Sequence, residues 1–454
     1  EQVAKIHQRL RDPKLDSKTE IELLDELTRV RDLRRKAQPV TASRQENYAS
    51  PRPVTGPQLQ AVLDSDSVVL EYAPVSQQTL LWAITKDQFK AYKLEDKEGA
   101  VLIQQYLRTL HAPLVGADEI RNHIDLGRRL YRMLVEPAAE IIRDKRHLII
   151  VPAGLLSYLP FESLNVPGNE KSLSDVQYLI NKFEITYAPS ASVLVAQRTN
   201  PEANRKGKRF PLVAFGDPIY GAEEPSSVAD IQETKIENLA LRGLDLRRLE
   251  FSGDEVLRIA QIWDVNPNSE HINLRDKATV DRLRKMDLTK YRIVHFAAHA
   301  VLADEVKRVL QPALLLSQTG HNETTANRLQ FSDILGLELN ADLVVLSACD
   351  TALGQLKNGE GIVGLTRAFL YAGASSTVVS LWKVEDQSTS FLMERFYQYL
   401  KRGLSKTEAL RQAKLATMRS TIDLKATGMR QDLASPFFWA PFILVGDWGP
   451  IQAN

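Results

Sequence analysis

A cysteine and a histidine stand at the ends of two apolar runs and together have the chemistry to cleave an acyl bond. Cys349, the single cysteine of the chain, ends the run that starts at Leu343, and His299 ends the run that starts at Tyr291. The two lie about 50 residues apart. A thiol is mostly protonated at neutral pH, and an adjacent imidazole raises its thiolate fraction and later protonates the leaving amine. This pair is therefore a candidate nucleophile and base.

Acyl transfer also needs hydrogen-bond donors for the oxyanion of the tetrahedral intermediate. The backbone N–H groups of Cys349 and of Ala300, the residue after His299, are the natural candidates. From the residue types alone, a buried and inert thiol remains the alternative for a lone cysteine, because free cysteine packs as a small hydrophobe.

The elements that must position the pair alternate between strand and helix. This order is typical of an α/β fold with a largely parallel sheet, whose reactive groups gather at the carboxyl ends of the strands. Two neighbouring strands would then bring both side chains to one edge. The pattern predicts strands at 68–72, 79–84, 147–152, 212–215, 291–298, 313–316, 343–348, 375–382 and 441–446, and helices at 98–110, 117–143, 253–263, 278–287, 361–372, 386–402 and 405–419.

Three regions follow along the chain. Residues 1–55 indicate a helical arm and a proline-rich linker, with Ser17 and Glu20 at capping-box spacing. Residues 56–205 and 206–449 each carry a round of strands and helices, which suggests two similar halves. No tandem repeat of 20–50 residues is found.

Composition limits the function classes. The chain has 454 residues, 44% hydrophobic and 25% charged, with 58 Lys plus Arg against 57 Asp plus Glu. This balance gives no electrostatic case for nucleic acid or an anionic membrane. We expect no membrane span and no signal peptide at the start, since neither apolar pattern is present. One cysteine excludes an internal disulfide and a Cys-rich zinc site, which favours a reducing cytoplasm.

Several blocks of the sequence resemble the signature blocks of CHAT domains. They are 151–155, 159–164, 188–192, 295–299, 346–352, 359–365, 380–386 and 439–442, so the resemblance covers roughly 120–447. CHAT domains are caspase-like modules, common in filamentous bacteria and usually found with helical TPR repeats. The resemblance implies the clan of caspases, separases, gingipains and clostripain, a caspase–haemoglobinase-like sheet, and chemistry without metal or cofactor. It also implies that the first half is a pseudo-caspase unit.

Two departures from the pattern matter. Family members usually carry Gly after the catalytic histidine, where this chain has Ala300. Since Gly adopts positive φ freely and Ala does not, Ala300 restricts the backbone conformations open to this oxyanion donor. Caspases proper carry Gln-Ala-Cys-x-Gly, whereas Cys349 lies in Ser-Ala-Cys-Asp-Thr. The preference of caspases for Asp is therefore not carried over.

Four neighbours of the pair are candidates for supporting roles. His295 lies on the same side of its strand as His299, either as a buried histidine bonded to backbone or as a support of the site. Asp350 either lines the pocket or caps a turn. By resemblance to separase, Asp386, with Glu385 beside it, pairs with a substrate Arg or Lys. The alternative for Asp386 is an N-cap of the helix at 387–402.

The leading hypothesis is a cysteine endopeptidase acting on a protein or peptide, with cleavage after a basic residue and self-processing as further expectations. The polar segments 219–250 and 317–330 are the candidate self-cleavage loops. The main alternative is a weak or inactive CHAT scaffold in a regulatory complex. A thiol hydrolase of esters or small amides is a third hypothesis, which product analysis would separate from the first. A TPR or other regulatory partner fits each of them.

Overall fold

The computed structural model describes residues 53–75, 78–94, 98–168, 170, 172–199, 208–220, 248–301, 311–318, 327–347, 361–383, 385–424 and 428–451. The chain divides into two units, Glu1–Arg52 and Pro53–Asn454. The predicted helical arm, at the start of region 1–55, lies outside the described residues. Within them, no helix is both long and apolar enough to cross a bilayer.

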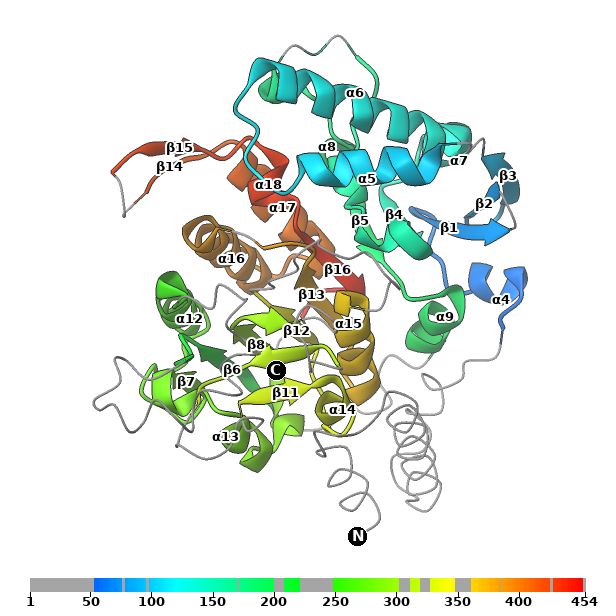
Figure 1. The fold of residues 1–454 in the computed structure, drawn as a ribbon. Coiled ribbons are helices and arrows are strands. Elements are labelled where there is room, and N and C mark those ends of the chain that lie inside the picture. The colour runs from blue at the N-terminus through cyan, green and yellow to red at the C-terminus, as the bar shows by residue number, and fades with distance from the viewer. Residues whose placement is uncertain are drawn as a thin grey trace, which may run out of the picture. The chain divides into compact units, whose positions relative to one another are not determined.

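One 11-stranded sheet runs through the described part of the second unit (Figure 1). Its first strands are β1 (Ser67–Val75), β4 (His147–Val151) and β5 (Glu184–Tyr187), which pair in parallel. The antiparallel strands β2 (Gln78–Ile84) and β3 (Phe89–Leu94) complete this side. Every residue of β4 is buried, as expected for an apolar run covered on both faces.

The other side of the sheet carries the strands of the candidate site. It holds β7 (Ile272–Leu274), β6 (Phe210–Gly216), β8 (Tyr291–Ala297), β12 (Leu343–Leu346) and β13 (Ser376–Ser380), all paired in parallel. The mostly parallel α/β sheet predicted from the sequence is confirmed.

Strand β16 (Phe442–Gly446) joins the two sides, because it pairs in parallel with β5 and antiparallel with β13. The strands of the two sides therefore run in opposite directions. The carboxyl ends of β6, β8 and β12 lie on one edge of the sheet, and those of β4 and β5 lie on the other.

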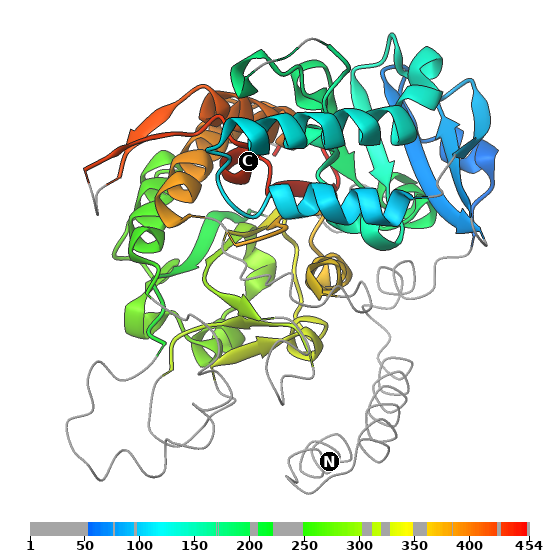
Figure 2. The same ribbon diagram turned by 45° about the horizontal axis from the view of Figure 1, so that its top comes forward.

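Helices cover both faces of the sheet. His295 of β8 contacts Tyr397 on one face, and the next residue, Phe296, packs on Phe369 on the other. Helices α5 and α6 lie side by side across the first part of the sheet in both views (Figures 1 and 2). The helices are α4 (Gly56–Gln60), α5 (Gly99–Thr109), α6 (Ala117–Leu134), α7 (Ala139–Ile142), α8 (Leu179–Lys182), α9 (Ala191–Thr199), α12 (Glu250–Ile262), α13 (Val280–Lys285), α14 (Phe331–Ile334), α15 (Gly361–Ala372), α16 (Asp386–Lys401), α17 (Lys406–Met418) and α18 (Pro436–Trp439).

Two smaller sheets accompany the large one. Strands β9 (Ala300–Val301), β10 (Ala313–Leu315) and β11 (Arg328–Gln330) form an antiparallel sheet directly after β8. Strands β14 (Thr421–Asp423) and β15 (Arg430–Asp432) form a hairpin that extends away from the helices (Figure 2).

A buried charge network fixes the edge opposite the candidate site. The Asp342 carboxylate, just before β12, accepts hydrogen bonds from Arg209 before β6 and from Arg292 of β8, at 3.0–3.2 Å. Its backbone carbonyl accepts from the Ser376 hydroxyl of β13 at 2.8 Å. Four neighbouring strands are thereby tied together at their starts.

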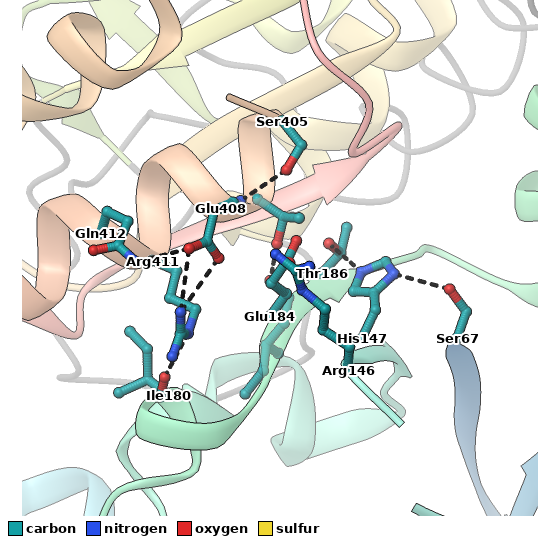
Figure 3. A network of polar contacts seen from close by, with 12 residues as sticks. Ser67, Arg146, His147, Ile180, Glu184, Thr186, Ser405, Glu408, Arg411 and Gln412 are labelled. Carbon is teal, nitrogen blue, oxygen red and sulfur yellow. Dashed lines mark hydrogen bonds and ion pairs between the residues drawn. The ribbon is translucent and has the colours of Figure 1, made fainter. Parts of the chain in front are cut away.

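A second group of polar contacts lies at the starts of β1, β4 and β5 and on the neighbouring helix α17 (Figure 3). The ring of His147 lies 3.2 Å from the Ser67 hydroxyl through Nδ1 and 2.9 Å from the Thr186 hydroxyl through Nε2. Arg411 of α17 donates to the Glu408 carboxylate and to the Ile180 carbonyl. The charge-assisted bonds of Arg411 thus hold α17 against α8, the helix just before β5.

Burial of His147 makes folding stability depend on pH. Desolvation lowers the pKa of His147 to about 4, with opposing smaller effects of Asp64 and Arg198. The unfolded chain binds this proton near pH 6.5, so the stabilisation is complete above that pH and is lost as the pH falls through 4. We expect His147 alone to remove about 2 kcal/mol of unfolding free energy between pH 7 and 5.

Urea unfolding of the wild type and of His147→Gln between pH 7 and 5 measures this loss. The variant should show a shallower pH dependence. The contribution of His123, whose pKa burial lowers to about 3, should persist in both proteins. Equal slopes in the two proteins would rule out His147 as a source of the acid sensitivity.

Candidate active site

His299 lies just beyond the carboxyl end of β8, between that strand and β9. All seven residues of β8 are buried, which fixes the strand that delivers it. Its carbonyl accepts a hydrogen bond from the backbone N–H of Leu315 at 2.8 Å, and the residue is 3% exposed. The histidine is therefore held by its backbone at the edge where the sequence predicts the site.

Tyr220 is the side chain that anchors His299 from the β6 side. Its hydroxyl accepts the His299 backbone N–H at 2.9 Å, and the two rings lie 4.9 Å apart. Burial raises the pKa of Tyr220 far above its usual range, with Asp217 and Asp386 adding to the rise. The phenol thus stays protonated. No sequence pattern predicts this role, because Tyr220 lies at the start of a polar segment.

Ala300 takes the place of the expected glycine without backbone strain. It is absent from the described residues with positive φ, and it pairs with Leu314 in the ladder of β9 and β10. The His299 carbonyl accepts a hydrogen bond from Leu315 of β10, and the trans peptide holds the Ala300 N–H on the opposite side. The Ala300 N–H therefore points away from β10. Because this position does not need a positive φ, alanine can replace glycine here without strain.

Strand β12 lies next to β8 and leads toward the predicted nucleophile. The two strands pair in parallel with Leu346 opposite Phe296, and the Ser347 N–H donates to the Phe296 carbonyl at 2.8 Å. Cys349 and Asp350 lie outside the described residues. Their predicted roles as nucleophile and pocket residue stay predictions.

Glu385 and Asp386 each engage a helix start. The Glu385 carboxylate caps α16, accepting from the backbone N–H groups of Gln387 and Ser388 at 3.0 and 2.6 Å. The alternative prediction that Asp386 caps this helix is wrong. Asp386 instead accepts the Phe251 N–H at 2.7 Å, at the start of α12. The sequence could not show that contact, since the two residues are far apart in the chain.

The environment of Asp386 disfavours its charge. Burial raises its pKa to about 7; the Phe251 hydrogen bond opposes the rise, and Glu255, Glu385 and Glu250 add to it. Near neutral pH this carboxyl group is therefore partly protonated. Its role in a substrate pocket stays a prediction.

His295 is fully buried behind the edge, between β8, α12 and α16. Its Nδ1 lies 2.9 Å from the Tyr397 hydroxyl. Its Nε2 lies 3.0 Å from Glu255, within ion-pair distance but outside hydrogen-bond geometry. The expected burial is present, but the partners are side chains rather than backbone. Only the tertiary fold brings these partners together.

Asp217 is a residue of this edge that the sequence reading missed. It follows β6 and has φ 46°, in the left-handed region, where Asp is among the more tolerant residues. Its carboxylate accepts two hydrogen bonds from Arg248, at 2.8 and 2.7 Å. Gly216-Asp217-Pro218 indicated only a strand end, although a carboxylate at the carboxyl end of a strand is itself a signal.

The comparisons with known proteins place this architecture in a family. The model of the CHAT domain matches residues 125–447, and the chain belongs to the CHAT domain family. The resemblance seen in the sequence is thereby confirmed.

Relatives and similar structures are distant. The chain is 25% identical over 359 residues to human Tetratricopeptide repeat protein 28, and 24% identical over 356 residues to the mouse protein. These matches cover 70% of this chain but only 13% of either relative. Among solved structures, the Saccharomyces cerevisiae separase–securin complex at 3.0 Å resolution has a TM-score of 0.48 at 10% identity, covering 95% of this chain and 32% of that one. Gingipain R has a TM-score of 0.38 at 8% identity, covering 88% and 79%.

Proposed function

We propose that this CHAT-family chain is a cysteine endopeptidase with Cys349 as nucleophile and His299 as base. The observation that carries the proposal is the register of β8 and β12. Phe296 lies opposite Leu346, and His299 and Cys349 each follow their strand residue by three positions. Cys349 follows Ser347 by two residues, so chain connectivity limits the separation of their Cα atoms to about 7 Å. Two parallel strands thus lead both residues toward one edge.

The proposed reaction has two acyl-transfer steps. His299 accepts the Cys349 thiol proton, and the thiolate sulfur forms a bond to the peptide carbonyl carbon. The N–H groups of Ala300 and Cys349 stabilise the oxyanion. His299 then returns the proton to the leaving amine as the C–N bond breaks. Water, activated by His299, hydrolyses the thioester that remains. The hydrogen bond to Tyr220 positions the backbone of His299, and His295 supports β8 from behind.

We further propose that the residue before the scissile bond is basic, with Asp386, Glu385 and Asp350 near its side chain. Support comes from Tyr220, whose pKa is raised by both Asp217 and Asp386. Both carboxyl groups thus lie within electrostatic reach of the ring that anchors His299. A carboxylate at such a position attracts arginine or lysine.

A weak or inactive scaffold is the second candidate, favoured by the 3% exposure of His299. In either case we expect a helical-repeat regulatory partner, which the tetratricopeptide repeat relatives support. A reducing cytoplasm is the expected compartment for a functional thiol.

The test uses a peptide library and a peptide-based electrophile on wild-type protein and on Cys349→Ala. We expect cleavage products and one covalent adduct on Cys349 from the wild type and neither from the variant, read by mass spectrometry. New N-termini within 219–250 or 317–330, absent from the variant, would support self-processing.

Two outcomes would contradict the proposal. Cleavage that persists in Cys349→Ala would assign the activity to another group. A wild-type cysteine that no electrophile labels, in the presence or absence of a partner, would favour the scaffold.

A further inference from the structure

An arginine of this chain already occupies a carboxylate at the edge of the candidate site. Arg248 donates from Nε and Nη2 to the two oxygens of Asp217, at 2.8 and 2.7 Å. Two parallel bonds are the form in which arginine recognises a carboxylate, and the lysine ammonium cannot reproduce it. Arg275 adds a weaker contact, with Nη1 3.7 Å from Asp217 Oδ1. The Asp217 carboxylate therefore has the position and the charge to bind a guanidinium group, and we call it the guanidinium receptor.

The receptor lies next to His299. Gly216, the last residue of β6, pairs with Ala297 of β8, so Asp217 and His299 follow paired positions by one and two residues. Tyr220, three residues after Asp217, accepts the His299 N–H. A side chain bound at Asp217 would thus lie beside the group proposed to act on the adjacent peptide bond.

The backbone holds the receptor in a rarely populated conformation. Asp217 has φ 46° and Arg275, facing it, has φ 54°. The Asp217 N–H donates to the Ser252 hydroxyl at 3.0 Å, and the Arg275 carbonyl accepts from the Ser317 hydroxyl. Such conformations persist only where neighbours fix them, and they collect at ligand-binding sites. The carboxylate is therefore positioned before any ligand arrives.

The exposures of the two partners differ. The Asp217 side chain is 8% exposed, whereas that of Arg248 is 54% exposed. The carboxylate is covered by a group that is itself in contact with water. Displacing Arg248 would open the carboxylate, and because Asp217 is buried, another cation must take the place of Arg248.

We propose that Asp217 is a specificity-determining residue that binds the guanidinium of a substrate arginine, and that Arg248 occupies it until the substrate displaces it. The proposal rests on the proposed peptidase function. One guanidinium replaces another, so the carboxylate is never left buried and unpaired. Arginine is preferred over lysine because only arginine restores both hydrogen bonds.

The test compares kcat/KM for two peptides that differ only in arginine or norleucine before the scissile bond. Removing the competitor in Arg248→Ala should raise the arginine-to-norleucine ratio about threefold to fivefold. Asp217→Asn should lower it at least tenfold, while asparagine still tolerates the left-handed backbone. The control is Arg258→Ala on α12, because Arg258 is 51% exposed and pairs with Glu394 at 2.6 Å. It should leave the ratio unchanged. An unchanged ratio in both Arg248→Ala and Asp217→Asn would overturn the proposal.

A binding measurement separates this proposal from the peptidase itself. Benzamidine, an amidinium probe, is titrated calorimetrically into Cys349→Ala chains. It should bind severalfold more tightly when Arg248 is also alanine and not detectably when Asp217 is asparagine. This order of affinities, together with a chain that keeps Cys349 and cleaves no peptide, would support guanidinium binding at Asp217 and refute the peptidase. A cleaving Cys349 chain, together with benzamidine affinities that change with neither Arg248 nor Asp217, would support the peptidase and refute guanidinium binding at Asp217.

Discussion

Replacing His299 with alanine should lower kcat for peptide cleavage by about 10³-fold, because a positioned general base contributes 10²–10⁴-fold. Two of the contacts that place this residue are made by its backbone, with Tyr220 and Leu315. Alanine keeps both, so the loss isolates the imidazole. Steady-state kinetics on a cleaved peptide measures it, with circular dichroism as the check of folding.

A second readout distinguishes chemistry from a packing defect. Alkylation of Cys349 by iodoacetamide, followed between pH 6 and 9, reports the thiolate fraction. The His299→Ala rate should rise only at more alkaline pH than the wild-type rate. Tyr220→Phe, which removes the hydroxyl but keeps the ring, is the matched control and should cost about tenfold or less, since a misplaced catalytic group loses only part of its effect. A His299→Ala enzyme within tenfold of wild type would exclude His299 as the base.

Asp342→Asn should lower the free energy of unfolding by about 3–5 kcal/mol. The change leaves Arg209 and Arg292 with a neutral partner, although their side chains are only 9% and 5% exposed. An uncompensated buried charge is among the most destabilising changes in a protein. The shift in the urea midpoint of the cooperative transition measures it.

The control for this variant is an exposed ion pair between strand β3 and helix α7. Lys90 and Glu140 are 3.0 Å apart, with side chains 41% and 74% exposed. Glu140→Gln should leave the urea midpoint almost unchanged, because surface ion pairs contribute little to stability. Equal effects of the two variants would mean that the Asp342 network carries no special share of the stability.

The strands and helices could largely be predicted because their patterns are local. The strand predicted at 147–152 is β4 in the structure, and the helix predicted at 405–419 is α17. Strand β3 was missed as a separate element, since Phe89–Leu94 alternates and is half exposed. The opposite directions of the two sides were also missed, because they depend on the pairing of β16 rather than on its own residues.

The residues of the site that stand at strand ends could be predicted from the order of the elements along the chain, but their partners could not. His299 stands at the predicted strand end, because an apolar run that meets polar sequence marks the carboxyl end of a buried strand. The partners of His295 and Asp386 could not be foreseen, since they come from α12 and α16, whose distance from β8 is set by packing. The Asp217–Arg248 pair could not be predicted either, because its two residues meet only in the folded chain.

The position of β16 has a consequence for synthesis on the ribosome. Strand β5 leaves the exit tunnel long before β16, which is made only after β6, β8, β12 and β13. Until then, the hydrogen-bonding groups on one side of both β5 and β13 lack the strand that finally occupies the space between them. Nascent chains therefore expose two open strand edges, a state that invites association with other chains. A chain that ends before β16 would keep both edges open permanently.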